Sequence, residues 1–320
     1  MTTRVRVPAS SSNVGSGFDC VGIAIDRWLT ASVTIETTGI GFSIRRRGKL
    51  STVKVRADQD LFTRGFRAAC SAGGGILPTG VAIDASSDIP VGCGLGSSAA
   101  AIVAGALLAN GALGLGLSRD DVLEIGTTIE GHPDNIAPAI YGGAVLSVHT
   151  PAGFVASPLA VAAGIELVIV VPPFPNDTKA ARAALPQTLK HTDAVVAAGR
   201  AAALVQGLAT GEGALLTAAL DDVLHVPYRR ARIPGYDAVV AAAEQAGAYG
   251  ATLSGAGSAI LAIAPVDRAG PVGRAMLAAW REIGVEAELI RCPGPVGGAT
   301  VITPPRTTHH EPRTIVKEIL

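Results

Sequence analysis

Apolar and polar positions alternate with two different periods along this chain, and the two periods predict strands mixed with helices. Every-second-residue alternation and β-branched content predict strands at residues 4–8 and 31–36, and short apolar stretches between turn signals predict strands at residues 80–86, 142–148, 166–171, 250–253 and 258–264. Helical spacing of apolar positions, continuous alanine-rich apolar runs and helix-start signals predict helices at residues 60–72, 97–110, 118–130, 190–209, 211–220, 235–246 and 268–283. Because strands and helices do not alternate regularly, the pattern indicates an α+β protein with two lobes.

Proline and glycine residues between these elements predict where the lobes divide. Pro151-Ala152-Gly153 interrupts the pattern, which then restarts, so we expect an N-terminal lobe at residues 1–155 and a C-terminal lobe at residues 156–303. Residues 304–320 are rich in proline and histidine, and we expect them to form a flexible tail. A chain of 320 residues is long enough to bury a substantial core in two such lobes.

A glycine-rich stretch at residues 89–100 is the most informative part of the chain. It reads Pro90-Val91-Gly92-Cys93-Gly94-Leu95-Gly96-Ser97-Ser98 and gives way at once to an uninterrupted apolar helix. Glycines let backbone N–H groups approach an anion, and the first turn of the helix adds unpaired N–H groups and the positive end of its dipole. The stretch therefore predicts a phosphate-binding loop, in which Ser97 and Ser98 add hydroxyls for phosphate or Mg²⁺.

Two other interpretations of this stretch are weaker. Residues 94–99 match the loose dinucleotide-binding pattern G-x-G-x-x-A, but residues 118–121 predict a helix start where a second strand ending in an acidic residue is required. Residues 91–118 carry no charge and are long enough to span a bilayer. They are, however, rich in Ala and Gly, contain Asn110 and lack aromatic or basic flanks, so we expect a buried helix and no membrane partner.

Composition excludes further classes of function. Lys and Arg number 26 and Asp and Glu number 26, so the chain has no electrostatic bias toward nucleic acid. Arg45-Arg46-Arg47 stands beside a Gly-Lys turn signal and is interpreted as a solvated edge.

The N-terminus alternates like a strand and lacks the apolar core of a signal peptide, which predicts a cytoplasmic protein. Cys20, Cys70, Cys93 and Cys292 lack metal-ligand spacing and predict reduced, buried thiols.

Other polar clusters are candidates for a site. Glu130-Gly131-His132-Pro133-Asp134-Asn135 is unusually polar in a chain with only 16% charged residues, and its glutamate suits Mg²⁺; a plain turn after a helix is the alternative. Arg182 and Arg229 each offer a planar fork for a carboxylate or phosphate, although a solvated helix arginine is the ordinary interpretation. The small-residue loop at residues 250–258 allows close approach of a ligand, and a tight hairpin explains it almost as well.

In order and content, these segments resemble the GHMP kinase superfamily and, within it, the homoserine kinases. The three superfamily motifs correspond to residues 13–19, 90–100 and 253–258. More specific to homoserine kinases are residues 8–19 and 130–139 and the paired segments Thr178 to Arg182 and His225 to Arg229. The resemblance covers residues 4 to about 300. It departs at Ser258, where the family usually has proline, and at residues 38–60, where no adenine-pocket residue is recognisable.

The resemblance implies a fold and an activity. The N-terminal lobe would resemble ribosomal protein S5 domain 2, the C-terminal lobe would be ferredoxin-like, and ATP would lie between them. The implied reaction is ATP-dependent phosphorylation of the side-chain hydroxyl of L-homoserine to O-phospho-L-homoserine, on the route to threonine. A homodimer is common in the family and is an expectation here.

The resemblance also implies roles for individual residues. The ATP phosphates would be held by Pro90, Val91, Gly92, Cys93, Gly94, Leu95, Gly96, Ser97, Ser98 and Gly255, with Ser98 and Glu130 serving Mg²⁺. Homoserine would be bound by Asn13, Asp19, His132, Asp134, Arg182 and Arg229, with Asp19 facing its ammonium and the two arginines its carboxylate. Asn135, which would also line the homoserine pocket, and Arg182 would orient and stabilise the transferring group.

The residue types agree with this assignment. A zwitterion with a neutral hydroxyl needs one anionic contact, a cationic clamp and a means of aiming the hydroxyl. Phosphoryl transfer through a loose transition state needs no strong base, and no lysine lies near Asn13 or Asp134 in the sequence.

Two alternative functions stay open. One is a GHMP-type kinase of another small alcohol, such as L-threonine or a mevalonate-like substrate, although mevalonate has no ammonium for Asp19. The other is a non-catalytic ATP- or metabolite-binding protein on the same fold.

Overall fold

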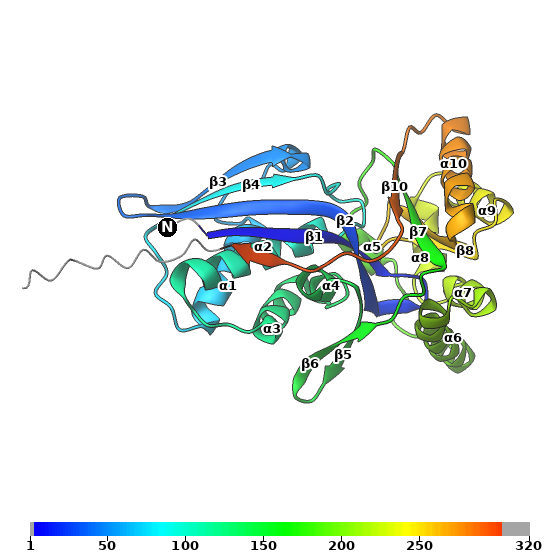
Figure 1. The fold of residues 1–320 in the computed structure, drawn as a ribbon, viewed down its shortest axis with the longest axis horizontal. Helices are drawn as coiled ribbons and strands as arrows, with labels where there is room; N and C mark the ends of the chain where they lie inside the picture. The colour runs from blue at the N-terminus through cyan, green and yellow to red at the C-terminus, as the bar shows by residue number, and fades with distance from the viewer. Residues whose placement is uncertain (1–2, 303–320) are drawn as a thin grey trace, which may run out of the picture.

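The computed structural model describes residues 3–302, which form two sheets with helices packed on them (Figure 1). The first sheet has seven strands in the order β11-β1-β2-β4-β3, with β5 paired to β2 and β6 to β5. Its strands are β1 (Thr3–Asn13), β2 (Gly17–Glu36), β3 (Gly41–Gly48), β4 (Gly80–Ser87), β5 (Ala144–Thr150), β6 (Gly153–Leu159) and β11 (Thr300–Ile302). All of its pairings are antiparallel except that of β3 with β4.

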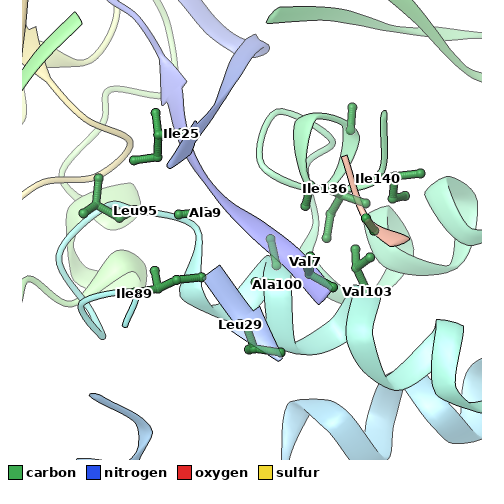
Figure 2. Close-up of a cluster of buried hydrophobic side chains, with 14 of the residues drawn as sticks. Val7, Ala9, Ile25, Leu29, Ile89, Leu95, Ala100, Val103, Ile136 and Ile140 are labelled. Carbon is green, nitrogen blue, oxygen red and sulfur yellow. The ribbon is translucent and has the colours of Figure 1, made fainter. Parts of the chain in front are cut away.

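Four helices lie on one side of this sheet (Figure 1). They are α1 (Leu61–Ala72), α2 (Ser97–Leu113), α3 (Arg119–Glu130) and α4 (Ile136–Tyr141). The apolar helix α2 lies against β1 and β2, and its residues 99–109 are all buried, because α1, α3 and the sheet cover them. Figure 2 shows this core, with Val7 and Ala9 of β1 beside Ala100 and Val103 of α2.

The second sheet has four strands in the order β10-β7-β9-β8, and every neighbour pair is antiparallel. Its strands are β7 (Ile165–Val171), β8 (Gly250–Leu253), β9 (Ile260–Pro265) and β10 (Glu288–Cys292). The helices after β7 are α5 (Thr178–Ala183), α6 (His191–Thr210), α7 (Gly213–Leu220), α8 (Val226–Arg229), α9 (Tyr236–Gln245) and α10 (Val266–Glu282), and short 3₁₀ turns follow β3 and α8. With α9 and α10 packed on it, this sheet has the expected ferredoxin-like arrangement.

The chain crosses from the first lobe to the second and then returns to the first. The Pro151–Gly153 segment, which was expected to end the first lobe near residue 155, is instead the turn of the β5–β6 hairpin, closed by a hydrogen bond from Thr150 Oγ1 to the Gly153 carbonyl at 2.8 Å. After β10 the chain returns to the first lobe, where β11 pairs with β1 (Figure 1). The first sheet therefore draws on residues 3–159 and on residues 300–302. The tail expected at residues 304–320 lies outside the described residues.

The predicted helices and most of the predicted strands are confirmed to within a few residues, but short or polar strands were missed. The missed strands are β3, β6, β10 and β11, and β2 is far longer than the six residues expected. The prediction of a wholly solvated Arg45–Arg47 edge is wrong for its middle member. Arg46 forms an ion pair with Asp60 and only 15% of its side chain is exposed, because alternate residues of β3 face opposite sides of the sheet.

Within residues 3–302, the structure contains no helix whose length and apolar character would let it cross a bilayer. The uncharged stretch at residues 91–118 is the glycine-rich loop, the buried helix α2 and the turn after it, as expected. All four cysteines are free, and three are buried; Cys20 is half-buried, so the expectation of buried thiols is wrong for that residue.

Candidate active site

A cavity of about 460 Å³ lies between the two lobes. The β1–β2 turn, the glycine-rich loop before α2 and the turn between α3 and α4 reach it from the first lobe, while α5, α8 and the β8–β9 loop reach it from the second. Every site residue predicted from the sequence lines it except Pro90 and Cys93. Those two are buried on the far side of the loop, where the Cys93 thiol faces the Val91 and Phe174 carbonyls.

The glycine-rich loop is held by its carbonyl groups. The Gly92, Cys93 and Leu95 carbonyls each accept a hydrogen bond from a backbone N–H, at 2.8, 3.0 and 3.2 Å, and the Gly94 carbonyl accepts one from Ser254 Oγ at 2.6 Å. Gly92, Gly94 and Gly96 all have positive φ. A Cβ on Gly94 would lie 2.0 Å from the Ser254 carbonyl oxygen, so only glycine fits there.

With its carbonyls bound, the loop presents its N–H groups. Among the residues that the structure describes, no N–H from Gly94 to Ala99 donates to a protein acceptor, and the next N–H, that of Ala100, bonds the Gly96 carbonyl at 2.9 Å. These amides surround the N-terminus of α2, which carries the positive end of a 17-residue helix dipole. Such an arrangement is typical of a phosphate-binding site.

Ser98 and Glu130 meet beside these amides. Ser98, in the first turn of α2, donates its hydroxyl to Oε1 of Glu130, the last residue of α3. A hydroxyl and a carboxylate next to a phosphate-binding loop are the oxygen ligands that Mg²⁺ takes together with phosphate oxygens and water. The residues present therefore fit Mg²⁺ at this point.

Asn135 lines the cavity and is fixed in one orientation. Its Oδ1 accepts a hydrogen bond from Ser10 at 2.8 Å, and its Nδ2 donates one to Ser12 at 2.8 Å. Both serines belong to β1 and are buried. One Nδ2 hydrogen remains for a ligand, since a primary amide has two.

The backbone is strained in the turn between β1 and β2 and in the strand residues beside it. Asn13, Val14 and Asp19 all have positive φ, which is rare for residues other than glycine and rarest for a β-branched residue such as Val14. Hydrogen bonds hold the turn: Asn13 donates Nδ2 to the Gly255 carbonyl at 2.9 Å and accepts the Asp19 N–H at 3.0 Å. The strain is consistent with a functional site, because surrounding contacts must maintain it.

The acidic side of the cavity carries three groups within 4.8 Å of one another, from Asp19, His132 and Asp134. His132 Nδ1 lies 2.6 Å from Asp134 Oδ1. Burial alone would lower the pKa of His132, but the hydrogen bond to Asp134 and the charges of Glu130 and Asp19 together raise that pKa above its ordinary value. Asp19 is bound through both oxygens by Arg182, and this hydrogen bonding raises the pKa of the arginine.

Arg229 is the most unusual charge in the cavity. Only 2% of the residue is exposed, yet it forms no ion pair with any carboxylate of residues 3–302. Its neighbours are neutral acceptors: the Ala181 carbonyl at 3.2 Å, the Gly255 carbonyl at 3.5 Å and His225 Nδ1 at 3.4 Å. Burial and the nearby charge of Arg182 lower the pKa of Arg229. A buried cation without a counter-ion is costly, which indicates that an anion binds beside it.

The other end of the cavity was not recognised in the sequence. It is lined by side chains from residues 46–62, namely Arg46, Leu50, Val53, Val55, Gln59, Asp60, Leu61 and Phe62. Arg46 holds this segment in place by pairing with Asp60, the N-cap of α1, and by donating to the Val55 carbonyl at 3.0 Å. The available signal was a group of apolar residues between a strand and a helix that no periodic element accounts for.

Ser258 occupies the position where the family usually has proline. It is fully buried, and its hydroxyl donates to the Phe174 carbonyl. The neighbouring glycine motif is intact, and Gly255 and Ala256 line the cavity. The departure therefore leaves the wall of the cavity in place.

Comparison with known proteins supports one assignment. Residues 60–143 match the family model for the GHMP kinase N-terminal domain, and residues 202–282 match that for the GHMP kinase C-terminal domain. The chain is 38% identical over 291 residues to homoserine kinase of Trichormus variabilis, with 88% of this chain and 93% of the relative covered. It is 41% identical over 294 residues to homoserine kinase of Gloeobacter violaceus, with 91% and 95% covered.

Solved structures agree. The crystal structure of homoserine kinase from Cytophaga hutchinsonii superposes with a TM-score of 0.84 at 30% identity, covering 94% of this chain and 97% of that one. A mevalonate kinase from L. major, at 17% identity, shares the fold with a TM-score of 0.65 over 89% of this chain and 94% of its own. From the matched domains and these relatives, the chain belongs to the homoserine kinase family of the GHMP kinases.

Proposed function

We propose that this protein transfers the γ-phosphoryl group of ATP to the side-chain hydroxyl of L-homoserine, giving O-phospho-L-homoserine and ADP for threonine biosynthesis. The observation that carries the proposal is Arg229, a buried cation without an ion-pair partner among residues 3–302, facing the same cavity as the free amides of the glycine-rich loop. One site thus offers a place for a carboxylate and a place for phosphates.

The remaining contacts fit a zwitterionic amino acid. Asp19 and Asp134 supply negative charge for an ammonium, and Arg229 and Arg182 lie on the side of the carboxylate. A substrate without an ammonium would leave the buried Asp134 paired only with His132. This asymmetry favours an amino acid over other small alcohols.

The amides of Gly94 to Ala99 would hold the phosphates of ATP, and the apolar end of the cavity around Leu50, Val53 and Phe62 would hold the adenine ring. Ser98 and Glu130 would bind Mg²⁺, which neutralises charge on the phosphate oxygens when it is bound. Each of these assignments uses a side chain or amide that faces the cavity.

Catalysis would rest on position and charge. The homoserine oxygen forms the new bond to the γ-phosphorus as the bond to the ADP oxygen breaks, and the hydroxyl proton passes late in a loose transition state to an oxygen of the transferred phosphoryl group, or to water. No lysine lines the cavity within the described residues, so no Asp–Lys pair is at hand to act as base. Asn135, held by Ser10 and Ser12, would orient the reacting groups through its remaining N–H, and Arg182 would stabilise the transferring charge.

The test is ADP release with Mg²⁺-ATP against L-homoserine, L-threonine, L-serine and mevalonate. We expect strong turnover with L-homoserine alone. Turnover with another alcohol instead would assign a different GHMP-type kinase, and no turnover with any of them would favour a binding protein. The homodimer and the cytoplasmic location stay predictions.

A further inference from the structure

His225 lies behind Arg229 and contacts it, although it does not line the cavity itself. It is fully buried at the N-cap of α8, the short helix that ends at Arg229. Its ring stacks on Phe18, with centroids 5.1 Å apart and an interplanar angle of 22°. Phe18 in turn lies beneath both guanidinium groups, 5.2 Å from that of Arg229 and 5.7 Å from that of Arg182.

The neighbours of the ring define its protonation. Nε2 lies 3.2 Å from the Gly15 carbonyl, which only accepts a hydrogen bond, so Nε2 must carry a proton. Nδ1 lies 3.4 Å from Nη1 of Arg229, which only donates, so Nδ1 must be bare. The neutral Nε2–H tautomer satisfies both contacts, whereas a protonated ring would place an N–H against the arginine.

The charges around the ring do not overturn this tautomer. Asp222 lies 3.7 Å from Nε2, but its carboxylate already accepts the N–H groups of Leu224, His225 and Val226 at 3.0, 2.7 and 2.7 Å. Burial lowers the pKa of His225 and Arg229 lowers it further, while Asp222, the Gly15 carbonyl and the more distant Asp19 oppose this. The net direction is downward, and the ring is neutral near pH 7.

We propose that His225 is a positioning residue for substrate recognition: its bare Nδ1 is the acceptor that aims the Arg229 guanidinium at the substrate carboxylate. This inference rests on the proposed function, since it concerns the same cavity. The other acceptors of Arg229 are two carbonyls, of which the Gly255 oxygen is at the 3.5 Å limit of a hydrogen bond. Without Nδ1, Nη1 of the guanidinium would keep only its 3.5 Å contact with the Gly255 oxygen, and the buried charge would be freer to turn away from the substrate.

The experiment compares two variants in which an amide side chain replaces the His225 ring, each reproducing the hydrogen bonding of one of its two nitrogens. His225→Asn places an acceptor near Nδ1, and His225→Gln places a donor near Nε2. We expect the Gln variant to raise the KM for L-homoserine about tenfold or more, since a charge-assisted hydrogen bond is lost, while the KM for ATP and kcat change by less than about threefold. The Asn variant should retain most of the homoserine affinity. His149→Asn, an exposed histidine on β5, is the matched control.

Several results would overturn the proposal. Equal losses in the Asn and Gln variants would mean that the ring acts only by packing on Phe18, and an unchanged KM in the Gln variant would mean that Nδ1 does not aim Arg229. ¹⁵N NMR of the histidines in the unliganded protein provides a measurement that does not depend on activity: we expect a neutral Nε2–H tautomer at pH 7, and an Nδ1–H or doubly protonated ring would refute it. If the wild type fails to phosphorylate L-homoserine but shows this tautomer, the proposed function fails while the Arg229 contact stands.

Discussion

Asp19 and Arg182 bind each other across the cavity, with Arg182 Nη1 2.9 Å from Asp19 Oδ2 and Arg182 Nη2 2.8 Å from Asp19 Oδ1. The two residues were assigned to opposite ends of the substrate, yet without it they satisfy each other. Since their side chains are 33% and 42% exposed, water screens the pair, and such a pair contributes only about 0–1 kcal/mol to stability. A zwitterion that exchanges its own charges for theirs therefore faces a small cost.

Asp19→Asn tests this exchange. We expect the KM for L-homoserine to rise about tenfold or more, because the ammonium loses a charged acceptor, while the unfolding temperature stays nearly unchanged. Steady-state kinetics and thermal unfolding measure the two effects. Glu286→Gln, which breaks an exposed pair with Arg281, is the control. A large drop in stability in the Asn variant would show that the pair is structural.

Replacing Arg229 should separate stability from function. Arg229→Met keeps much of the buried volume and removes a charge that has no counter-ion among residues 3–302. We expect the homoserine KM to rise by about a hundredfold, with ATP binding intact, and the free energy of unfolding of the unliganded protein to stay level or increase. Calorimetric titration and urea unfolding measure these effects. If the variant lost ATP binding but kept normal homoserine affinity, the assignment of Arg229 to the substrate carboxylate would be wrong.

The glycine-rich loop predicts a specific failure at Gly96. A Cβ there would lie 2.1 Å from Ser10 Oγ and 3.0 Å from Asn135 Oδ1, so Gly96→Ala should disturb both the loop and the Asn135 contacts. We expect ATP affinity to fall at least tenfold in a protein that still folds. Gly74→Ala is the control, since Gly74 also has positive φ but open space around it and should lose only about 1–2 kcal/mol of stability. Normal ATP affinity in the Gly96 variant would remove this loop from the nucleotide site.

Glu130 gives a prediction about the metal. Glu130→Gln removes the carboxylate that accepts from Ser98 but keeps its shape. We expect the Mg²⁺ concentration for half-maximal rate to rise about tenfold or more, with the homoserine KM less affected. A titration of activity against Mg²⁺ at fixed ATP measures this. An unchanged Mg²⁺ requirement would mean that the carboxylate serves another purpose.

The buried imidazole of His225 predicts how stability depends on pH. Its pKa in the folded protein is lowered, chiefly by burial, so below about pH 6.5 the unfolded chain binds a proton that the folded chain does not. Its contribution to stability is therefore present above that pH and is lost as the pH falls, at up to about 1.4 kcal/mol per pH unit. Urea unfolding at pH 7.5 and 5.5 should show a smaller loss in His225→Asn than in the wild type. Equal losses would contradict a neutral His225.

Continuous apolar runs predicted the elements whose environment is uniform. Helix α2 was found because residues 99–109 of it are all buried, and β7 because both of its faces are covered. Strand β3 was missed because Arg45 and Arg47 point outward to Asp84 while Arg46 turns to Asp60, so charge masks the alternation. Strand β11 has three residues and depends on pairing with β1, which no local pattern shows.

The residues of the candidate site were predicted from motifs, but their mutual contacts were not. Distant segments meet there: Asn135 bonds Ser10, and Asn13 bonds the Gly255 carbonyl. The apolar end of the cavity could not be predicted from the sequence, because its side chains come from an irregular segment that has no periodic pattern. The place of His225 was also hidden, since a histidine's partners depend on how α8 packs against the β1–β2 turn.

Because the chain returns to β1 only after β10, the first sheet cannot be completed until β11 has been synthesised. Strand β1 is made long before its partner β11 and before Val296 and Ala299, which also contact the first lobe. Until these emerge from the ribosome, one edge of β1 stays open to other strands. A messenger truncated after the codon for Cys292 would encode a complete second sheet and a first lobe that is prone to aggregate.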